Sequence, residues 1–314
     1  MCEVNQTQVT QIHLLRFRSL AKFKTLLFIV VILTYLIILC GNLIIIIVVT
    51  TVDPLKIPMF FLKNLATADI LLTTSLVPMM LDIPFIEEGR LSFVGCITQL
   101  YTFGIFGFVQ CFQIAVMSYD QYLALCKPLH YASLLNPHVC LQLVLGSWFL
   151  VTLLTSSEFM VVVQFNFFGI NYIDHFVCDL EPIIELSTSD TSSLMLQDFE
   201  LSIFVIFCPF TFIIITYMYI FFIILQTSSA YSRRKAFSTC SSHLATVCAY
   251  YGTLITVYMV PGDDSTASIN KYRSLVYIVV KPLINPIIHS LRNQKIKKAL
   301  LKFVIKLKTD SLKF

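Results

Sequence analysis

Two ionisable residues, Asp69 and Lys281, stand inside long apolar stretches of the sequence, where a charge is costly and marks a functional candidate. Three amide residues stand in comparable surroundings, namely Asn42, Gln110 and Asn285. A buried carboxylate is stabilised by an ammonium group, by a bound cation or by hydrogen bonds from amides. We therefore expect these five residues to form a polar cluster inside an otherwise apolar protein.

The other side chains that commonly perform catalysis do not form a recognisable set. Five of the six histidines lack metal-ligand spacing and a nearby nucleophile: His130, His138, His175, His243 and His289. The 10 cysteines contain no Cys-x-x-Cys pair. The pattern predicts no enzyme, no metal site and no cofactor.

The composition predicts a membrane protein. Of the 314 residues, 57% are hydrophobic and 13% are charged, and the mean hydropathy is +0.81. A soluble domain carries about 25% charged residues. The basic residues are not interleaved with exposed aromatic residues, so we expect membrane lipid rather than nucleic acid as a partner.

Seven stretches are apolar enough to cross a membrane as helices, which takes about 20 residues each. They are residues 25–52, 57–81, 91–119, 139–157, 201–232, 236–262 and 274–291. The first stretch is too long to be the apolar part of a signal peptide. The predicted fold is an all-α bundle of seven transmembrane helices at 25–291. An N-terminal tail (1–24) precedes it and a C-terminal segment (292–314) follows it.

Basic residues indicate the orientation of this bundle. With the N-terminus outside, 14 of the 22 lysine and arginine residues lie on the cytoplasmic side and 7 lie outside, as the positive-inside rule favours. Four basic residues just before the first stretch favour the opposite orientation. They are outweighed by a glycosylation sequence at Asn5 and by the acidic loop at 164–196. We expect the N-terminus outside and the C-terminus in the cytoplasm.

The C-terminal segment alternates lysine with large apolar residues between positions 294 and 308. Such a pattern is typical of an amphipathic helix on anionic lipid, which attracts each basic residue by about 1 kcal/mol. The alternative is a disordered basic tail. We expect a short amphipathic eighth helix.

Three cysteines face the oxidising side in this orientation, namely Cys2, Cys96 and Cys178. Cys96 opens the third apolar stretch and Cys178 lies in the acidic loop. A disulfide between these two would tie the loop over the bundle, and Cys2 would be left over.

Several segments spread along the chain resemble motifs of the odorant receptors, a family of rhodopsin-like G-protein-coupled receptors. They are residues 58–62, 65–69, 117–131, 235–244 and 282–293, together with Gly41, Asn42 and Trp148. The resemblance covers residues 1–300. It implies a plasma-membrane protein of olfactory cilia that binds a small odorant and activates a heterotrimeric G protein of the cAMP-raising type.

The resemblance also implies where ligand and G protein bind. The ligand site carried over from the family comprises Phe103, Gly104, Gly107, Phe108, Leu201, Val205, Tyr251, Tyr258 and Ile278. These side chains are aromatic and nearly uncharged, which suits a mainly hydrophobic ligand. The alternative role for each position is helix packing, which small residues such as Gly104 and Gly107 favour.

The carried-over G-protein site comprises Asp120, Gln121, Tyr122, Arg233, Arg234 and Lys235. The alternative reading of its three basic residues is a positive-inside anchor. The family has an arginine where Gln121 stands, so we hypothesise weakened coupling or altered basal activity.

Further departures from the family concern the polar cluster and the long loop. Related receptors hold a sodium ion beside the second-helix aspartate, but here Gln110 replaces a glutamate and Lys281 adds a cation. We hypothesise that Lys281 pairs with Asp69 and replaces the ion. Phe168 and Thr188 stand where the family has two further loop cysteines, and His289 replaces a tyrosine.

The sequence does not favour a transporter or channel, which would have inverted repeats and more intramembrane charges than Asp69 and Lys281. Two rival readings remain. A rhodopsin-like receptor for a non-odorant ligand would share the fold, and an odorant receptor with impaired coupling would share the ligand site.

Overall fold

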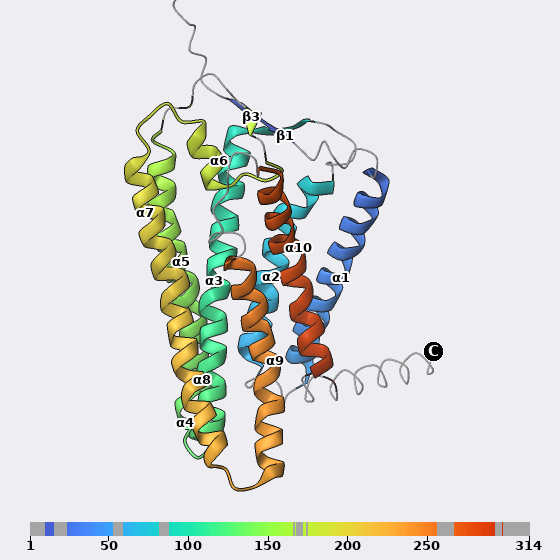
Figure 1. Ribbon diagram of the computed structural model, residues 1–314, viewed down its shortest axis with the longest axis vertical. Coiled ribbons are helices and arrows are strands. Elements are labelled where there is room, and N and C mark those ends of the chain that lie inside the picture. The colour runs from blue at the N-terminus through green and yellow to red at the C-terminus, as the bar shows by residue number, and fades with distance from the viewer. Residues whose placement is uncertain are drawn as a thin grey trace, which may run out of the picture.

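The computed structural model describes residues 10–15, 24–52, 59–81, 88–165, 167, 172–173, 175–255, 267–292 and 297. Long helices dominate this part of the chain and run side by side along its longest axis (Figure 1). They are α1 (Lys24–Thr51), α2 (Phe60–Leu81), α3 (Phe93–Cys126), α5 (Pro137–Val162), α7 (Ser192–Ser202), α8 (Cys208–Gln226), α9 (Ala230–Leu254) and α10 (Ala267–Arg292). Helices α7 and α8 are joined without a break by the π-helical turn η3 (Ile203–Phe207).

Five helical segments of the described chain are long and apolar enough to cross a membrane. They are Thr25–Thr51, Phe60–Leu81, Phe93–Cys126, Pro137–Val162 and Ser192–Gln226. Each coincides with one of the first five predicted stretches, and α9 and α10 lie where the sixth and seventh were expected. The chain is a multi-pass helical membrane protein.

Several helices extend beyond the predicted stretches because those were bounded at charged residues, whereas α8 ends at Gln226, before the predicted end at 232. Helix α3 continues past Asp120 to Cys126, and α7 begins before Asp198. A charged side chain does not end a helix whose backbone hydrogen bonds continue, so the absence of charge locates a span but not its ends.

A small β-sheet at one end of the bundle corrects the prediction of an all-α fold. Strand β1 (Gln11–Leu15) pairs antiparallel with β2 (Glu88–Ser92) and parallel with β3 (Tyr172–Ile173). The short helix α6 (Leu180–Glu185) lies at this same end, called here the strand end (Figure 1). Ile12 and Leu14 of β1 are fully buried. The predicted N-terminal tail thus contains an ordered strand.

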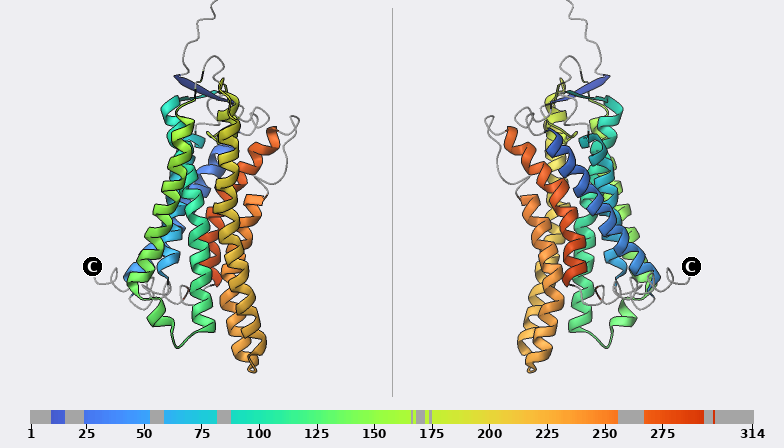
Figure 2. Two further views of the ribbon diagram at one scale, coloured as in Figure 1. Left: turned by 90° about the vertical axis from the view of Figure 1, so that its left-hand side faces the viewer. Right: turned by 90° about the vertical axis from the view of Figure 1, so that its right-hand side faces the viewer.

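The opposite end of the bundle carries the short helix α4 (Tyr131–Leu134) and the turn between α8 and α9. Both views in Figure 2 show the α8–α9 hairpin projecting beyond the other helices at this end, called here the hairpin end.

Two local features shape the bundle. Pro209 lacks a backbone N–H, and its ring crowds the carbonyl of residue 205, which explains the wider π-helical turn directly before α8. Gly41 on α1 faces Pro286 on α10 so closely that an added Cβ would lie 2.9 Å from the proline Cβ. Only glycine permits this approach of α1 to α10.

Candidate functional site

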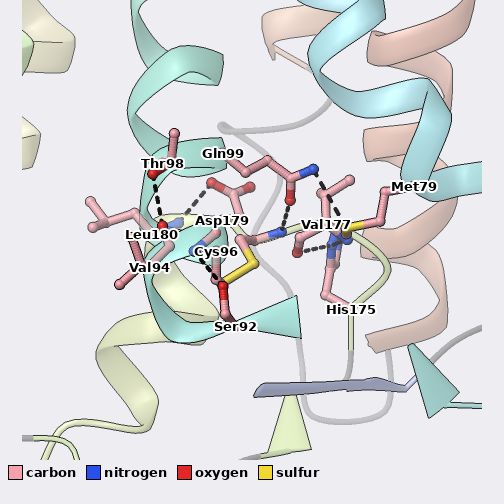
Figure 3. The surroundings of a disulfide bond; sticks show 12 residues. Met79, Ser92, Val94, Cys96, Thr98, Gln99, His175, Val177, Asp179 and Leu180 are labelled. Carbon is pink, nitrogen blue, oxygen red and sulfur yellow. Dashed lines mark hydrogen bonds between the residues drawn. A yellow bond between two sulfur atoms is a disulfide. The ribbon is translucent and has the colours of Figure 1, made fainter. Parts of the chain in front are cut away.

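A disulfide links Cys96 at the start of α3 to Cys178 in the loop before α6, as predicted (Figure 3). Both residues are fully buried. The backbone N–H of Cys178 also donates a hydrogen bond to Oε1 of Gln99 over 3.1 Å. The loop is therefore held over the helices by one covalent bond and one buried hydrogen bond.

A cavity of about 350 Å³ lies beneath this loop, a size within the usual range for small-molecule sites. Its walls come from α3, α5, α6, α7, α9 and α10. The lining residues are Leu100, Tyr101, Phe103, Gly104, Gly107, Phe108, Thr155, Glu158, Phe159, Val162, Asp179, Leu180, Ile184, Met195, Asp198, Ser202, Leu254 and Tyr277. The cavity combines an aromatic wall with a group of acidic side chains.

Four of the nine expected ligand-site residues line this cavity, all of them on α3: Phe103, Gly104, Gly107 and Phe108. Leu201, Val205, Tyr251 and Ile278 are instead buried in the main hydrophobic core. Tyr258 lies outside the described residues. Unlike the expected set of residues, the lining of this cavity includes three acidic side chains, Glu158, Asp179 and Asp198.

The two glycines of α3 serve both close packing and the cavity. A Cβ at Gly104 would lie 3.3 Å from Cγ2 of Thr155, and one at Gly107 would lie 3.1 Å from the Tyr277 hydroxyl. The packing role and the lining role that the sequence left open thus apply together.

A buried cluster of tyrosines borders the cavity. The Tyr250 hydroxyl donates a hydrogen bond to the Gly107 carbonyl over 2.8 Å and lies 2.8 Å from Sγ of Cys111. Tyr277 lines the cavity and packs edge-on against Phe103. Sequence reasoning missed Tyr250 and Tyr277, since single tyrosines in apolar stretches resemble ordinary core residues.

Lys281 extends into this tyrosine cluster and does not form the direct ion pair expected with Asp69. Its Nζ donates to the Tyr277 hydroxyl over 3.4 Å and lies 4.2 Å from the centroid of the Tyr250 ring and 4.6 Å from that of Tyr277. The faces of two aromatic rings attract an ammonium group. The Lys281 ammonium group therefore lies against two aromatic rings. Asn285, the hydrogen-bond partner of Asp69, stands one helical turn further along α10.

Asp69 is fully buried and accepts a 2.7 Å hydrogen bond at Oδ2 from the side chain of Asn285. Its Oδ1 has no hydrogen-bond partner among the described residues. Asn42 donates to the Ile38 carbonyl, and the fully buried Gln110 amide makes no hydrogen bond in the described chain. Lys281 acts on the Asp69 carboxylate through space. The donor set does not fit a resident sodium ion, because a fixed cation already neutralises the carboxylate.

Asp120 at the hairpin end accepts a 2.6 Å hydrogen bond from the Tyr131 hydroxyl on α4. Burial and the neighbouring Asp120 carboxylate both raise the pKa of Tyr131 above its ordinary value. The phenol thus stays protonated at neutral pH and keeps α4 attached to the end of α3.

Gln121 is joined to two other helices by a tyrosine that sequence reasoning missed. The Tyr217 hydroxyl on α8 donates to Oε1 of Gln121 over 3.0 Å and lies 2.6 Å from Nδ1 of His243 on α9. Tyr122 is part-buried and packs against the ring of Tyr219. The glutamine is therefore a hydrogen-bond acceptor in a contact that spans α3, α8 and α9.

The expected basic run lies in the first turns of α9, on the projecting hairpin. Arg233 donates to the Thr227 carbonyl over 3.3 Å, and Arg234 is exposed. Several expectations lie outside the described side chains: Asn5, Cys2, Phe168, Lys235, His289 and most of the predicted eighth helix.

The multi-pass helical fold and the comparison with known proteins define the class of protein, a G-protein-coupled receptor. Residues 31–307 match the family described as olfactory receptor. Olfactory receptor 2W1 of Homo sapiens is 40% identical over 253 residues, covering 80% of this chain and 78% of that protein. Olfactory receptor 1f45 of Rattus norvegicus is 39% identical over 303 residues, covering 96% and 97%. The chain belongs to the olfactory receptor family, whose members are receptors and not enzymes.

Proposed function

We propose that this chain is an odorant receptor that binds a small organic ligand in the cavity beneath the disulfide-tied loop and activates a cAMP-raising G protein. The observation that carries the proposal is the cavity itself, walled by aromatic residues of α3 and closed over by the loop that Cys178 anchors. Its volume of about 350 Å³ suits a ligand of odorant size.

A chain of contacts leads from this cavity toward the middle of the bundle. Tyr277 lines the cavity and holds Lys281, which acts in turn on Asp69 of α2. A ligand that moves Tyr277 would change the position of the cation, and with it the packing of α10 on α2. We propose this route as the link between ligand binding and the hairpin end.

The hairpin end is the proposed docking surface for the G protein. It presents Asp120 and Gln121 near the end of α3, beside the basic residues Arg233 and Arg234 on the projecting α8–α9 hairpin (Figure 2). In the proposed orientation the strand end lies outside the cell and the hairpin end lies in the cytoplasm, as the distribution of basic residues favours.

The test is a cAMP assay in cells that express the chain with an N-terminal surface tag. A broad odorant panel should raise cAMP through at least one member, and cells without the receptor should not respond. The rival receptor for a non-odorant ligand would reach the surface and stay silent to every odorant.

The orientation has its own test in the same cells. Glycosidase treatment should reduce the apparent mass of the native chain and leave that of an Asn5→Gln variant unchanged. An identical mass before and after treatment of the native chain would contradict an extracellular Asn5.

A further inference from the structure

Three carboxyl groups line the cavity from three separate elements, which no feature of the family resemblance anticipates. Glu158 lies on α5, Asp198 on α7 and Asp179 directly before α6. Glu158 is only 9% exposed. No lysine, arginine or histidine occurs among the described residues that line this cavity.

These carboxyl groups influence one another across the cavity. Glu158 and Asp198 interact electrostatically, and the Asp179 carboxylate acts on both. Like charges that share a poorly hydrated site repel each other unless a proton or a cation lies between them. Within the described part of the chain no basic side chain forms an ion pair with Glu158 or Asp198. The site thus has an excess of negative charge that a cationic ligand would neutralise.

The hydroxyl group of Thr155, on the same wall of the cavity, makes no hydrogen bond with the described residues. Thr155 lines the cavity and is 5% exposed. It precedes Glu158 by three positions on α5, so both side chains lie on the same helix face. A buried hydroxyl oxygen without a donor is an unused acceptor for an N–H group.

Aromatic rings form the rest of the lining near these groups. Tyr101, Phe103, Phe108 and Phe159 contribute rings, and those of Tyr101 and Phe159 pack 4.9 Å apart. Such rings accommodate an apolar body and attract a cation at their faces. The described residues contain no group of three histidine, cysteine or acidic side chains arranged to hold a metal ion, so an organic cation suits the site better.

We propose that the cavity binds a protonated organic amine, with its ammonium group between Glu158 and Asp198 and its apolar body against the α3 aromatic wall. Thr155 accepts an N–H from the same ammonium group, and Asp179 adds a third negative charge at the loop. This inference rests on the proposed function and narrows its ligand to one chemical class.

Binding is measured separately from signalling, so that the two proposals fail independently. The purified full-length receptor in detergent is heated with hexylamine, cyclohexylamine or benzylamine, and with the alcohol of the same carbon skeleton in each case. The rise in Tm reports binding. The same compounds are applied to receptor-expressing cells in the cAMP assay.

The variants are Glu158→Gln and Asp198→Asn, with Glu200→Gln as the matched control. Glu200 lies on α7 two positions after Asp198, but it is exposed and does not line the cavity. Both cavity variants remove a repulsion between carboxyl groups, so each should fold and reach the cell surface.

The expected result is a rise in Tm with at least one amine and with none of the alcohols. Glu158→Gln and Asp198→Asn should each weaken the binding of the amine by about tenfold or more, and Glu200→Gln should leave the binding unchanged. An equal rise with the alcohols, no rise with any amine, or an amine response unaffected by both cavity variants would overturn the proposal. A cAMP response to neutral odorants without an amine shift would leave the proposed function standing. An amine shift without any cAMP response would leave the inference standing and count against the proposed function.

Discussion

The Tyr217 hydroxyl group on α8 donates a hydrogen bond to Oε1 of Gln121 on α3 over 3.0 Å. The same hydroxyl lies 2.6 Å from Nδ1 of His243 on α9, which places an N–H donor or a second acceptor beside it. Three helices thus meet at one phenol at the hairpin end. The family arginine at position 121 would bring a charge to this point, whereas glutamine brings a neutral acceptor that tyrosine can satisfy.

Tyr217→Phe should loosen the contact between α3, α8 and α9. The loss of a part-buried hydrogen bond costs about 1 kcal/mol, so Tm should fall and basal cAMP should rise as α9 separates more readily from α3. Tyr219→Phe is the control, because Tyr219 lies on the same helix and is 59% exposed. Equal basal cAMP and equal Tm in Tyr217→Phe and the native chain would exclude a role for this contact.

Lys281→Met should make the receptor sensitive to sodium. The native chain holds an ammonium group near Asp69, so exchanging sodium for potassium at constant ionic strength should leave its Tm unchanged. Without Lys281 the Asp69 carboxylate is buried with one oxygen unpartnered, and two cation–π contacts worth about 2 kcal/mol are lost. The variant should therefore have a lower Tm that sodium partly restores.

The control for this prediction is the double variant Asp69→Asn with Lys281→Met, which removes the carboxylate as well. It should show no difference between sodium and potassium. A native chain that sodium stabilises as strongly as it stabilises Lys281→Met would contradict the view that the lysine takes the place of the ion.

Cys178→Ser should lower the amount of receptor at the cell surface. The Cys96–Cys178 bond closes a loop with a sequence separation of 82 residues, and a cross-link of this length stabilises the folded state by about 4–5 kcal/mol. Flow cytometry against an N-terminal tag measures the loss. Cys248→Ser, which alters an exposed free cysteine, should leave the surface level unchanged. Normal surface levels of Cys178→Ser would show that the hydrogen bond from Cys178 to Gln99 and the loop packing suffice.

The parts of the fold that follow from apolar length could be predicted from the sequence, and the acidic wall of the cavity could not. The absence of charge located the spans, but the same criterion ended the fourth stretch at residue 157 and began the fifth at 201. Glu158 and Asp198 were thereby excluded from the helices that carry them. The strand at Gln11–Leu15 was also missed. Its alternation of polar and apolar residues was present in the sequence, but the criterion for spans selects only long apolar stretches.

The position of Lys281 shows a different limit. Its depth in the bundle follows from the sequence, but the direction of a long side chain depends on its neighbours. Tyr277 stands four positions earlier on the same helix face and was the available signal for a cation–π contact. The electrostatic relation to Asp69 was foreseen, and the direct pairing was not found.

The central claim is that this chain, with Gln121 in place, transmits ligand binding to a G protein. The most direct measurement is a dose–response curve of cAMP for the native chain and for Gln121→Arg, at matched surface expression and with one odorant panel. The account predicts that the native chain responds in a concentration-dependent way and that Gln121→Arg raises the maximal response. A native chain that reaches the surface and stays silent, while Gln121→Arg responds, would contradict it and would show an intact ligand site with impaired coupling.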